Sequence, residues 1–229
     1  HRAFMALTVD SMAQLHRHNE HVRYVVVFQN WLKPAGASID HLHKQVVAID
    51  EVGADNESVL PKAVLDPGIF NRWGPDFAVE HGLVLACNDG AVMTVGFGHR
   101  YPSVEVWSTS RVDQPWRVDD EGIDAVSDLL HAAHVAVSDD VPANEEWHYR
   151  PMGTGVPVPW RIILKLRTST LAGFEGGTKI YVNTISPTTL AAMLLPKLFE
   201  ARAAGRIAAM NLGDECEIPR GVLAVTRER

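Results

Sequence analysis

The sequence predicts an α+β fold whose sheet is mainly antiparallel. The predicted strands come in groups of two or three, and an Asn88-Asp89-Gly90 turn joins two of them as a hairpin. Three longer segments carry helix signals, and they separate these groups of strands. Together the two observations are typical of strands paired through hairpins, with helices packed beside the sheet.

Composition narrows the class of protein. A chain of 229 residues with 46% hydrophobic and 21% charged residues suits a globular protein with a sizeable core. Its formal charge of −7 argues against a nucleic-acid binder, which would carry a basic field. No apolar run approaches the roughly 20 residues of a membrane span, and no signal peptide is visible. We therefore expect a cytoplasmic protein without a nucleic-acid or membrane partner.

The two cysteines, Cys87 and Cys216, are far apart in sequence and form no CxxC pattern. A reducing compartment is the simpler interpretation, and a single long-range disulfide stays open.

The first part of the chain predicts a helix followed by two strands. The sequence starts at His1, not Met, and enters this helix almost at once, so we expect an N-terminal piece to be missing. The predicted elements are a helix capped by Thr8 or Asp10 and ending near Glu20, a strand over 22–28, a loop over 31–40 and a strand over 41–49.

Polar side chains alternate along the second of these strands. His41, His43 and Gln45 occupy positions i, i+2 and i+4, which share one face of a strand. Leu42, Lys44 and Val46 would then occupy the opposite face. The preceding loop of small residues, 35–38, allows backbone N–H groups to approach an anion closely. A polar stripe on an apolar strand indicates a binding or catalytic site.

The remainder of the chain predicts a crossover and a second group of strands. Residues 50–80 are polar and rich in Pro and Gly, which is typical of an irregular connection with one or two short helices. We therefore predict an N-terminal half over 1–55, a crossover over 56–80 and a C-terminal half over 81–229. The elements expected in that half are strands over 83–87, 92–97, 104–107, 145–150, 160–166 and 180–182, a loop over 168–177, a helix capped by Asp119 or Asp120 and ending near Val137, a helix over 187–204, and a tail from Ile207 with a further short helix and an apolar segment over 222–225.

These motifs resemble a known family. The pattern FQN, GAS and HLHKQ is similar to the FxN, GxS and HxHxQ signature of the galactose-1-phosphate uridylyltransferase branch of the histidine-triad superfamily. WHYRP at 147–151 and AGFEGG at 172–177 resemble further segments of that family. The resemblance implies two histidine-triad-like halves, each an antiparallel sheet with flanking helices, and a homodimer. The family's opening strands and cysteine pair are absent from these residues.

The resemblance also implies a chemistry that belongs to carbohydrate metabolism. By family position His43 is the nucleophile that attacks the α-phosphorus of a nucleoside diphosphate sugar, giving a covalent nucleotidyl-histidine. A sugar 1-phosphate or phosphate then accepts the nucleotide. Ser38 and Gln45 would contact the phosphate oxygens. The residues expected to bind the nucleotide are Asn30, Gly36, Ala37 and Glu175.

The resemblance leaves metal binding open. His41 resembles a metal-binding or structural histidine, which could hold zinc together with His1 and ligands from the missing segment. In metal-binding members two histidines occupy the positions of Ile163 and Lys165, so His148 has lost those partners.

Two alternatives to a transferase or phosphorylase follow. The lost histidines allow a noncatalytic homologue that binds nucleotides. A hydrolase of nucleotide conjugates is also possible within the superfamily, but those enzymes have a third histidine where this chain has Gln45.

Overall fold

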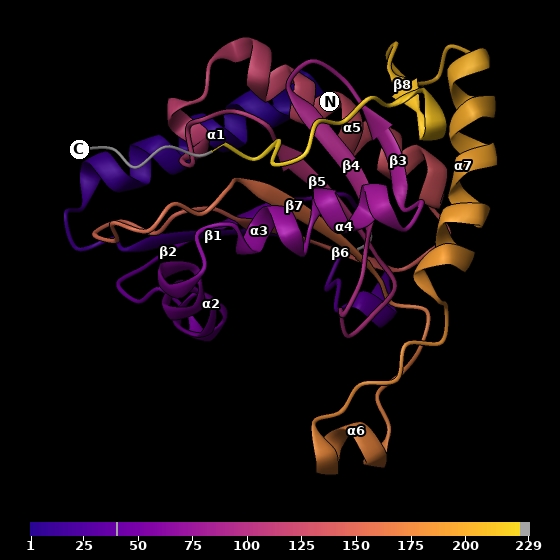
Figure 1. Ribbon diagram of the computed structural model, residues 1–229. Helices are drawn as coiled ribbons and strands as arrows, with labels where there is room; N and C mark the ends of the chain where they lie inside the picture. The colour runs from indigo at the N-terminus through magenta and orange to yellow at the C-terminus, as the bar shows by residue number, and fades with distance from the viewer. Residues whose placement is uncertain (40, 225–229) are drawn as a thin grey trace.

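The strands form a single eight-stranded sheet in the order β2-β1-β6-β7-β5-β4-β3-β8, in a computed structural model that describes residues 1–39 and 41–224 (Figure 1). Every pair of neighbouring strands is antiparallel. The predicted α+β class with an antiparallel sheet is therefore confirmed. The strands are β1 (Tyr24–Trp31), β2 (Gln45–Ile49), β3 (Val84–Cys87), β4 (Ala91–Gly96), β5 (Ser103–Ser108), β6 (Ala143–His148), β7 (Arg161–Leu166) and β8 (Asn211–Leu212).

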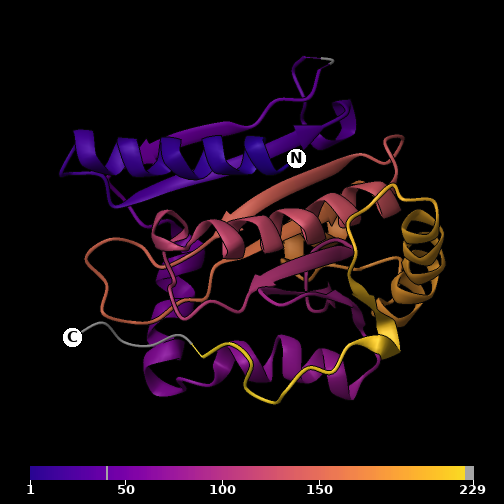
Figure 2. The same cartoon turned by 90° about the horizontal axis from the view of Figure 1, so that it is seen from above.

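The helices pack on both faces of this sheet. The three long helices α1 (Arg2–His18), α5 (Asp120–Val137) and α7 (Pro187–Ala203) contact β1 and β2, β4 and β5, and β3 and β4, respectively. The view from above shows α5 and α4 on opposite sides of β3 and β4 (Figure 2). The shorter helices are α2 (Ala54–Leu65), α3 (Ile69–Arg72), α4 (Pro75–Glu80) and α6 (Gly173–Thr178).

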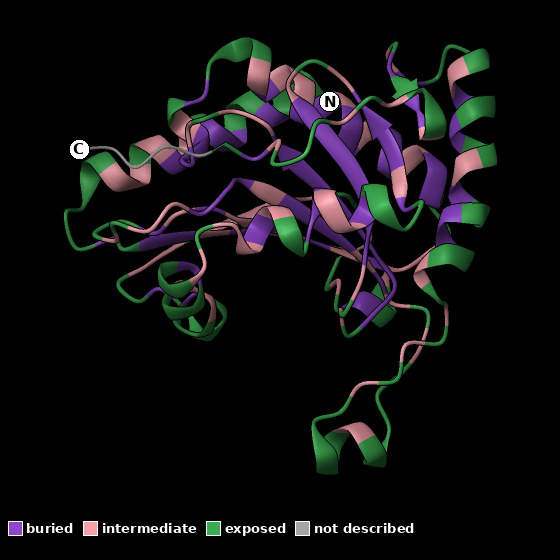
Figure 3. Ribbon diagram, in the orientation of Figure 1, coloured by how far each residue is buried: buried purple, intermediate pink, exposed green. Residues whose placement is uncertain are grey.

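Burial is uneven across the sheet (Figure 3). Every residue of β4 and β5 is buried. Helix α5 packs on both strands, α4 and α7 also contact β4, and Trp107 of β5 packs in a cluster with Phe70 of α3. The edge strand β2 has no fully buried residue. Three large indoles, those of Trp107, Trp147 and Trp160, are almost fully buried near the middle of the sheet. The less covered part of the sheet, around β1, β2 and β6, is therefore the part that can admit a ligand.

The N-terminal elements differ from their predicted bounds. Helix α1 begins at Arg2, and the Thr8 hydroxyl does not cap it but donates to the carbonyl of Phe4 inside the helix. Strand β1 extends to Trp31 because it pairs with β2 on one side and with β6 on the other. The predicted strand over 41–49 is wrong for its first four residues, since β2 begins only at Gln45.

The C-terminal part contains more helix than expected. The crossover holds three helices, α2 to α4, where one or two were predicted. Residues 173–177 of the loop predicted over 168–177 belong to α6, and the strand predicted over 180–182 is wrong. Instead, β8 pairs with β3, and a 3-10 turn, Gly213–Glu215, follows it. The loop predicted over 31–40 and the apolar segment over 222–225 extend onto Asp40 and Val225, which lie outside the described residues.

The sheet also joins the two predicted halves. Strand β1, from the first 55 residues, pairs with β6, from the segment after residue 80. The division at 1–55, 56–80 and 81–229 stays a prediction. Cys87 and Cys216 are both free thiols. Within residues 1–39 and 41–224, no helix has the length and apolar character needed to cross a membrane.

Candidate functional site

The loop that carries the polar motif is held by β6 from two sides. The side-chain amide of Asn144 donates from Nδ2 to the carbonyl of Ala35, at 2.7 Å. The next residue, Glu145, forms an ion pair with the ammonium group of Lys44. Consecutive residues of a strand point to opposite faces, so β6 holds one end of the loop on each face of the sheet.

The Lys44–Glu145 pair is buried. The side chain of Lys44 is 4% exposed and that of Glu145 is 1% exposed. Glu145 also accepts hydrogen bonds from Trp147 Nε1 at 2.6 Å and, when that nitrogen carries a proton, from His134 Nε2 at 3.0 Å. Burial alone would raise the pKa of Glu145, but the Lys44 charge and the His134 contact outweigh it and lower this pKa to about 2. Lys44 therefore acts as an anchor on the face opposite to the predicted site residues.

His43 has a defined tautomer. Its Nδ1 lies 3.0 Å from the carbonyl oxygen of His41, and a carbonyl can only accept a hydrogen bond. Nδ1 therefore carries the proton in the neutral ring, and Nε2 keeps a free lone pair. Residues 41–44 do not continue β2, whose pairing with β1 ends at Phe28 and Gln45. The rings of His41 and His43 are 5.7 Å apart.

The small residues before the motif form a tight turn. Gly36 adopts a left-handed conformation with φ of 88°, which glycine accommodates without strain. The N–H groups of Gly36 and Ala37 donate to the carbonyls of Lys33 and Leu32, so both are already engaged within the loop. Ser38 is exposed, and neither its N–H nor its hydroxyl makes a hydrogen bond to a described residue. Roles for these three residues in binding stay predictions.

A cavity of about 390 Å³ lies beside β1 and β6, where α2 begins. Asn30 and Phe28 line it from β1, and Asn144, Glu146 and His148 line it from β6. Gln45 lies directly opposite Phe28 in the β1–β2 pair, so its side chain shares the face that borders the cavity. The structure thus brings Asn30 and Gln45 to one face, with His43 two residues before Gln45.

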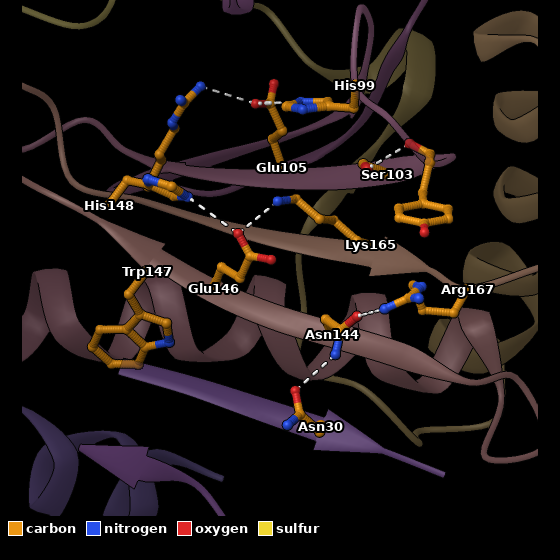
Figure 4. Close-up of polar contacts among 12 residues, drawn as sticks. Asn30, His99, Ser103, Glu105, Asn144, Glu146, Trp147, His148, Lys165 and Arg167 are labelled. Carbon is orange, nitrogen blue, oxygen red and sulfur yellow. Dashed lines mark hydrogen bonds and ion pairs between the residues drawn. The ribbon is translucent and has the colours of Figure 1, made fainter. Parts of the chain in front are cut away.

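Polar side chains continue from this cavity across β7 and β5 (Figure 4). Glu146 Oε2 is 2.6 Å from Lys165 Nζ and 3.8 Å from His148 Nε2. Burial raises the pKa of Glu146, but its neighbours His148 and Lys165 lower it overall to about 2. Burial also lowers the pKa of His148, and the Arg161 charge adds to this effect, so its imidazole is neutral at pH 7.

A second carboxylate extends the network. Glu105 Oε1 lies 3.0 Å from His99 Nε2 and 3.1 Å from Arg161 Nη1. Burial would raise the pKa of Glu105, but the His99 contact and the Arg161 charge lower it on balance. The two carboxylates of this face are therefore ionised and matched by cations from β7.

Glu175 lies away from this cavity. It belongs to α6, which projects from the body of the protein (Figure 1). Its carboxylate accepts a hydrogen bond from the Ala172 N–H at 3.0 Å, and such backbone donors lower its pKa. Within one copy of the chain, the structure does not bring Glu175 to Asn30 and His43.

The donor set for a metal does not assemble in the described part of the chain. No group of three or more His, Cys, Asp and Glu side chains there could hold an ion. His1 contacts Ser127, His131 and His134 on α5, whereas the ring neighbour of His41 is His43. Lys165 Nζ pairs with Glu146 Oε2 at 2.6 Å. Zinc binding by His41 stays a prediction.

Sequence reasoning missed the contribution of β6. Asn144, Glu145 and Glu146 are consecutive polar residues at the start of a strand in the middle of the sheet. Three polar side chains in a central strand indicate partners on both faces, because unpaired buried polar groups are costly. The run of polar residues is visible in the sequence. Its partners cannot be identified from the sequence, because they come from distant segments, namely the β1–β2 loop, α5 and β7.

Comparisons with known proteins agree with this geometry at the level of the fold. A family model described as "Domain of unknown function (DUF4921)" matches residues 1–225. No curated protein sequence matches the chain significantly.

Three solved structures are similar to the chain. An ADP-glucose phosphorylase from Arabidopsis thaliana, solved with bound ADP-glucose, has 21% identity and a TM-score of 0.71, and the match covers 83% of this chain but only 64% of that one. A GalT-like protein from Arabidopsis thaliana has 20% identity and a TM-score of 0.70, covering 83% and 67%. A uridylyltransferase mutant has 17% identity and a TM-score of 0.71, covering 87% and 71%. The predicted resemblance to uridylyltransferase-like proteins is confirmed for the fold.

Proposed function

Because the chain belongs to the family described as domain of unknown function DUF4921 and has a uridylyltransferase-like fold, we propose that it is a nucleotidyltransferase acting on nucleoside diphosphate sugars. The observation that carries the proposal is the tautomer of His43, whose Nδ1–H is held by the His41 carbonyl. This leaves Nε2 available as a nucleophile, in a loop that Asn144 and Glu145 of β6 hold at Ala35 and Lys44.

The proposed reaction has two steps. The lone pair of His43 Nε2 forms a bond to the α-phosphorus, and the bond from that phosphorus to the bridging oxygen breaks, which releases the sugar 1-phosphate. The imidazole becomes a cation that retains its Nδ1 proton, and the His41 carbonyl stabilises it. A phosphate or sugar 1-phosphate oxygen then attacks the phosphorus and displaces His43. Ser38 and Gln45 would donate to the phosphate oxygens.

The test is a covalent adduct. The protein is incubated with UDP-glucose or ADP-glucose labelled at the α-phosphate, and the denatured protein is analysed for an acid-labile label. We expect label on the wild-type protein and none on His43→Ala. The matched control is His18→Ala, because His18 Nδ1 also lies 2.8 Å from a carbonyl, that of Gln14, but is exposed on α1. Label retained by His43→Ala would contradict the assignment.

The same experiment separates the alternatives. A noncatalytic homologue binds the nucleotide in calorimetry and forms no adduct. A hydrolase releases nucleoside monophosphate to water without returning it to a sugar 1-phosphate. A transferase or phosphorylase shows exchange of label between the nucleotide sugar and added sugar 1-phosphate.

The proposal includes a homodimer in which α6 reaches a second copy. The arm around α6 exposes apolar side chains, among them Phe174 at 54%, Ile180 at 62% and Val182 at 56%. An exposed apolar segment on a projecting arm is typical of a surface that packs against a partner. Because Glu175 lies on this arm, it would contact the nucleotide held by His43 of the other copy.

Mixing two inactive variants tests this arrangement. We expect His43→Ala and Glu175→Gln each to be impaired alone. After unfolding and refolding them together, a mixed dimer has one site with a native His43 and a native Glu175 from different copies. Activity should then recover toward a quarter of the wild-type value. No recovery, despite mixed dimers detected by mass spectrometry, would place Glu175 outside the partner's site.

A further inference from the structure

Three side chains form a hydrogen-bonded row from Arg167, directly after β7, to the cavity (Figure 4). Arg167 Nη1 is 2.9 Å from Asn144 Oδ1, and Asn144 Nδ2 is 2.7 Å from Asn30 Oδ1. Asn144 Nδ2 is also 2.7 Å from the carbonyl oxygen of Ala35. Asn30 and Asn144 both line the cavity of about 390 Å³.

The chemistry of the partners fixes the orientation of both amides. A guanidinium can only donate, so the Asn144 atom that faces Arg167 must be the oxygen. A backbone carbonyl can only accept, so the Asn144 atom that faces Ala35 must be the nitrogen. Two independent partners therefore assign the same orientation. Because the Asn144 NH₂ group donates, the Asn30 atom that faces it must be the oxygen.

Asn30 is left with one free group. Its Oδ1 is occupied by Asn144, and its Nδ2 donates to no described residue. We propose that Arg167 and Asn144 are positioning residues that present Asn30 as a hydrogen-bond donor to an acceptor atom of the bound nucleotide. The inference rests on the proposed function for its ligand, and it assigns a direction to the contact that the resemblance leaves undefined.

The direction matters because it selects the ligand atom. An NH₂ group binds phosphate, hydroxyl or carbonyl oxygens, and the strongest of these acceptors is an ionised phosphate. An amide oxygen facing the ligand would repel such an atom. The row therefore discriminates between nucleotide atoms through the direction of the Asn30 amide.

The substitution Asn144→Asp reverses the row. Both oxygens of the introduced carboxylate accept, so one can still bind Arg167, but the other can no longer donate to Asn30. Asn30 then turns its own NH₂ group toward this carboxylate and presents its oxygen to the cavity. Asn144→Ala removes the constraint without reversing it. Arg167→Met leaves the Ala35 carbonyl to hold Asn144, so its effect should be the smallest.

Binding is measured by calorimetry with UMP and AMP, and with uridine and adenosine to separate the phosphate from the nucleoside. We expect Asn144→Asp to weaken monophosphate binding at least tenfold more than Asn144→Ala. Asn144→Asp also introduces a negative charge, which weakens phosphate binding by itself. Asn144→Asp in the Asn30→Ala background measures this effect of the charge alone. The loss should shrink at least several-fold there, because no amide remains to reverse.

Nuclear magnetic resonance gives a readout in the free protein. The Asn30 side-chain NH₂ protons should exchange with solvent quickly in the wild type and become protected in Asn144→Asp. Equal losses with and without Asn30, or unchanged protection, would overturn the proposal. If uridine and adenosine bind as tightly as UMP and AMP, the atom that accepts from Asn30 belongs to the nucleoside and not to the phosphate.

The proposed function can fail separately. One result is that the nucleotides bind and Asn144→Asp has the expected effects, but no labelled adduct forms on His43. This result would exclude the transferase while supporting the role of Asn30. A labelled adduct on His43, together with nucleotide binding that no Asn144 variant changes, would support the transferase and overturn the role of Asn30. If none of the four ligands binds the wild-type protein, the donor role of Asn30 is overturned.

Discussion

At the residue scale, the site depends on side chains that alternate between the two faces of the sheet edge. Gln45 shares the face of Phe28 beside the cavity, whereas Lys44 reaches Glu145 on the other face. The residue between the proposed nucleophile and its phosphate partner is therefore an anchor. Because both charges of this pair are buried, each depends on the other for compensation.

Lys44→Met tests the anchor. It keeps most of the apolar side chain but leaves Glu145 buried without its main counter-charge, so we expect unfolding free energy to fall by about 3 kcal/mol. Glu145→Gln in the same chain should restore part of the loss, because the uncompensated charge is then gone. Arg2→Met is the control, since its pairs with Asp124 and Asp128 are exposed at the surface and should matter much less. Urea unfolding measures all four proteins, and equal losses for Lys44 and Arg2 would contradict the anchor.

At the element scale, helix ends were predictable where a cap residue is present. The sequence left Asp119 and Asp120 as alternatives for the start of α5, and the structure decides for Asp119, whose carboxylate accepts from the Gly122 N–H at 2.9 Å. Ser186 likewise caps α7 by accepting from the Thr189 N–H, and Gly205, with φ of 67°, follows its end. Strand ends were less predictable, because pairing partners determine them.

Replacing the two aspartates separately tests the assignment of the α5 cap. Asp119→Ala removes the hydrogen bond to Gly122 and should cost about 1 kcal/mol of stability. Asp120→Ala removes only a favourable charge in the first turn and should cost a few tenths of that. Thermal unfolding distinguishes them, and a larger loss for Asp120→Ala would reverse the assignment.

At the scale of the whole molecule, folding makes several ionisable groups on the sheet and on α1 less easy to protonate. Burial lowers the pKa of His16 and of His148 from the ordinary value of 6.5. The folded-state pKa values of Glu145 and Glu146 are both about 2, compared with 4.5 for an ordinary glutamate. In each case the unfolded chain binds protons at a higher pH than the folded one, so acid favours unfolding.

We therefore expect stability to be greatest above about pH 6.5 and to decline in two stages. The first follows His16 and His148 below pH 6.5, and the second follows the two glutamates between about pH 4.5 and 2. Glu145 alone corresponds to about 3 kcal/mol of the second stage. Urea titrations from pH 8 to 2 measure both. The Lys44→Met and Glu145→Gln double variant should lose part of the second stage, and an unchanged pH profile for it would contradict this origin.

The sequence by itself determined the fold class, most of the elements and the motif with Asn30, Ser38, His43 and Gln45. These features depend on local periodicity, on cap and turn residues and on residue types at fixed spacing, which the linear chain contains. Only the tertiary structure decided which side chains hold that motif. Ala35 and Lys44 are tied to Asn144 and Glu145, which lie about a hundred residues later, and Arg167, directly after β7, bonds Asn144. Such contacts are set by strand order and register, because pairing across the sheet depends on packing between distant segments and not on the local sequence of either.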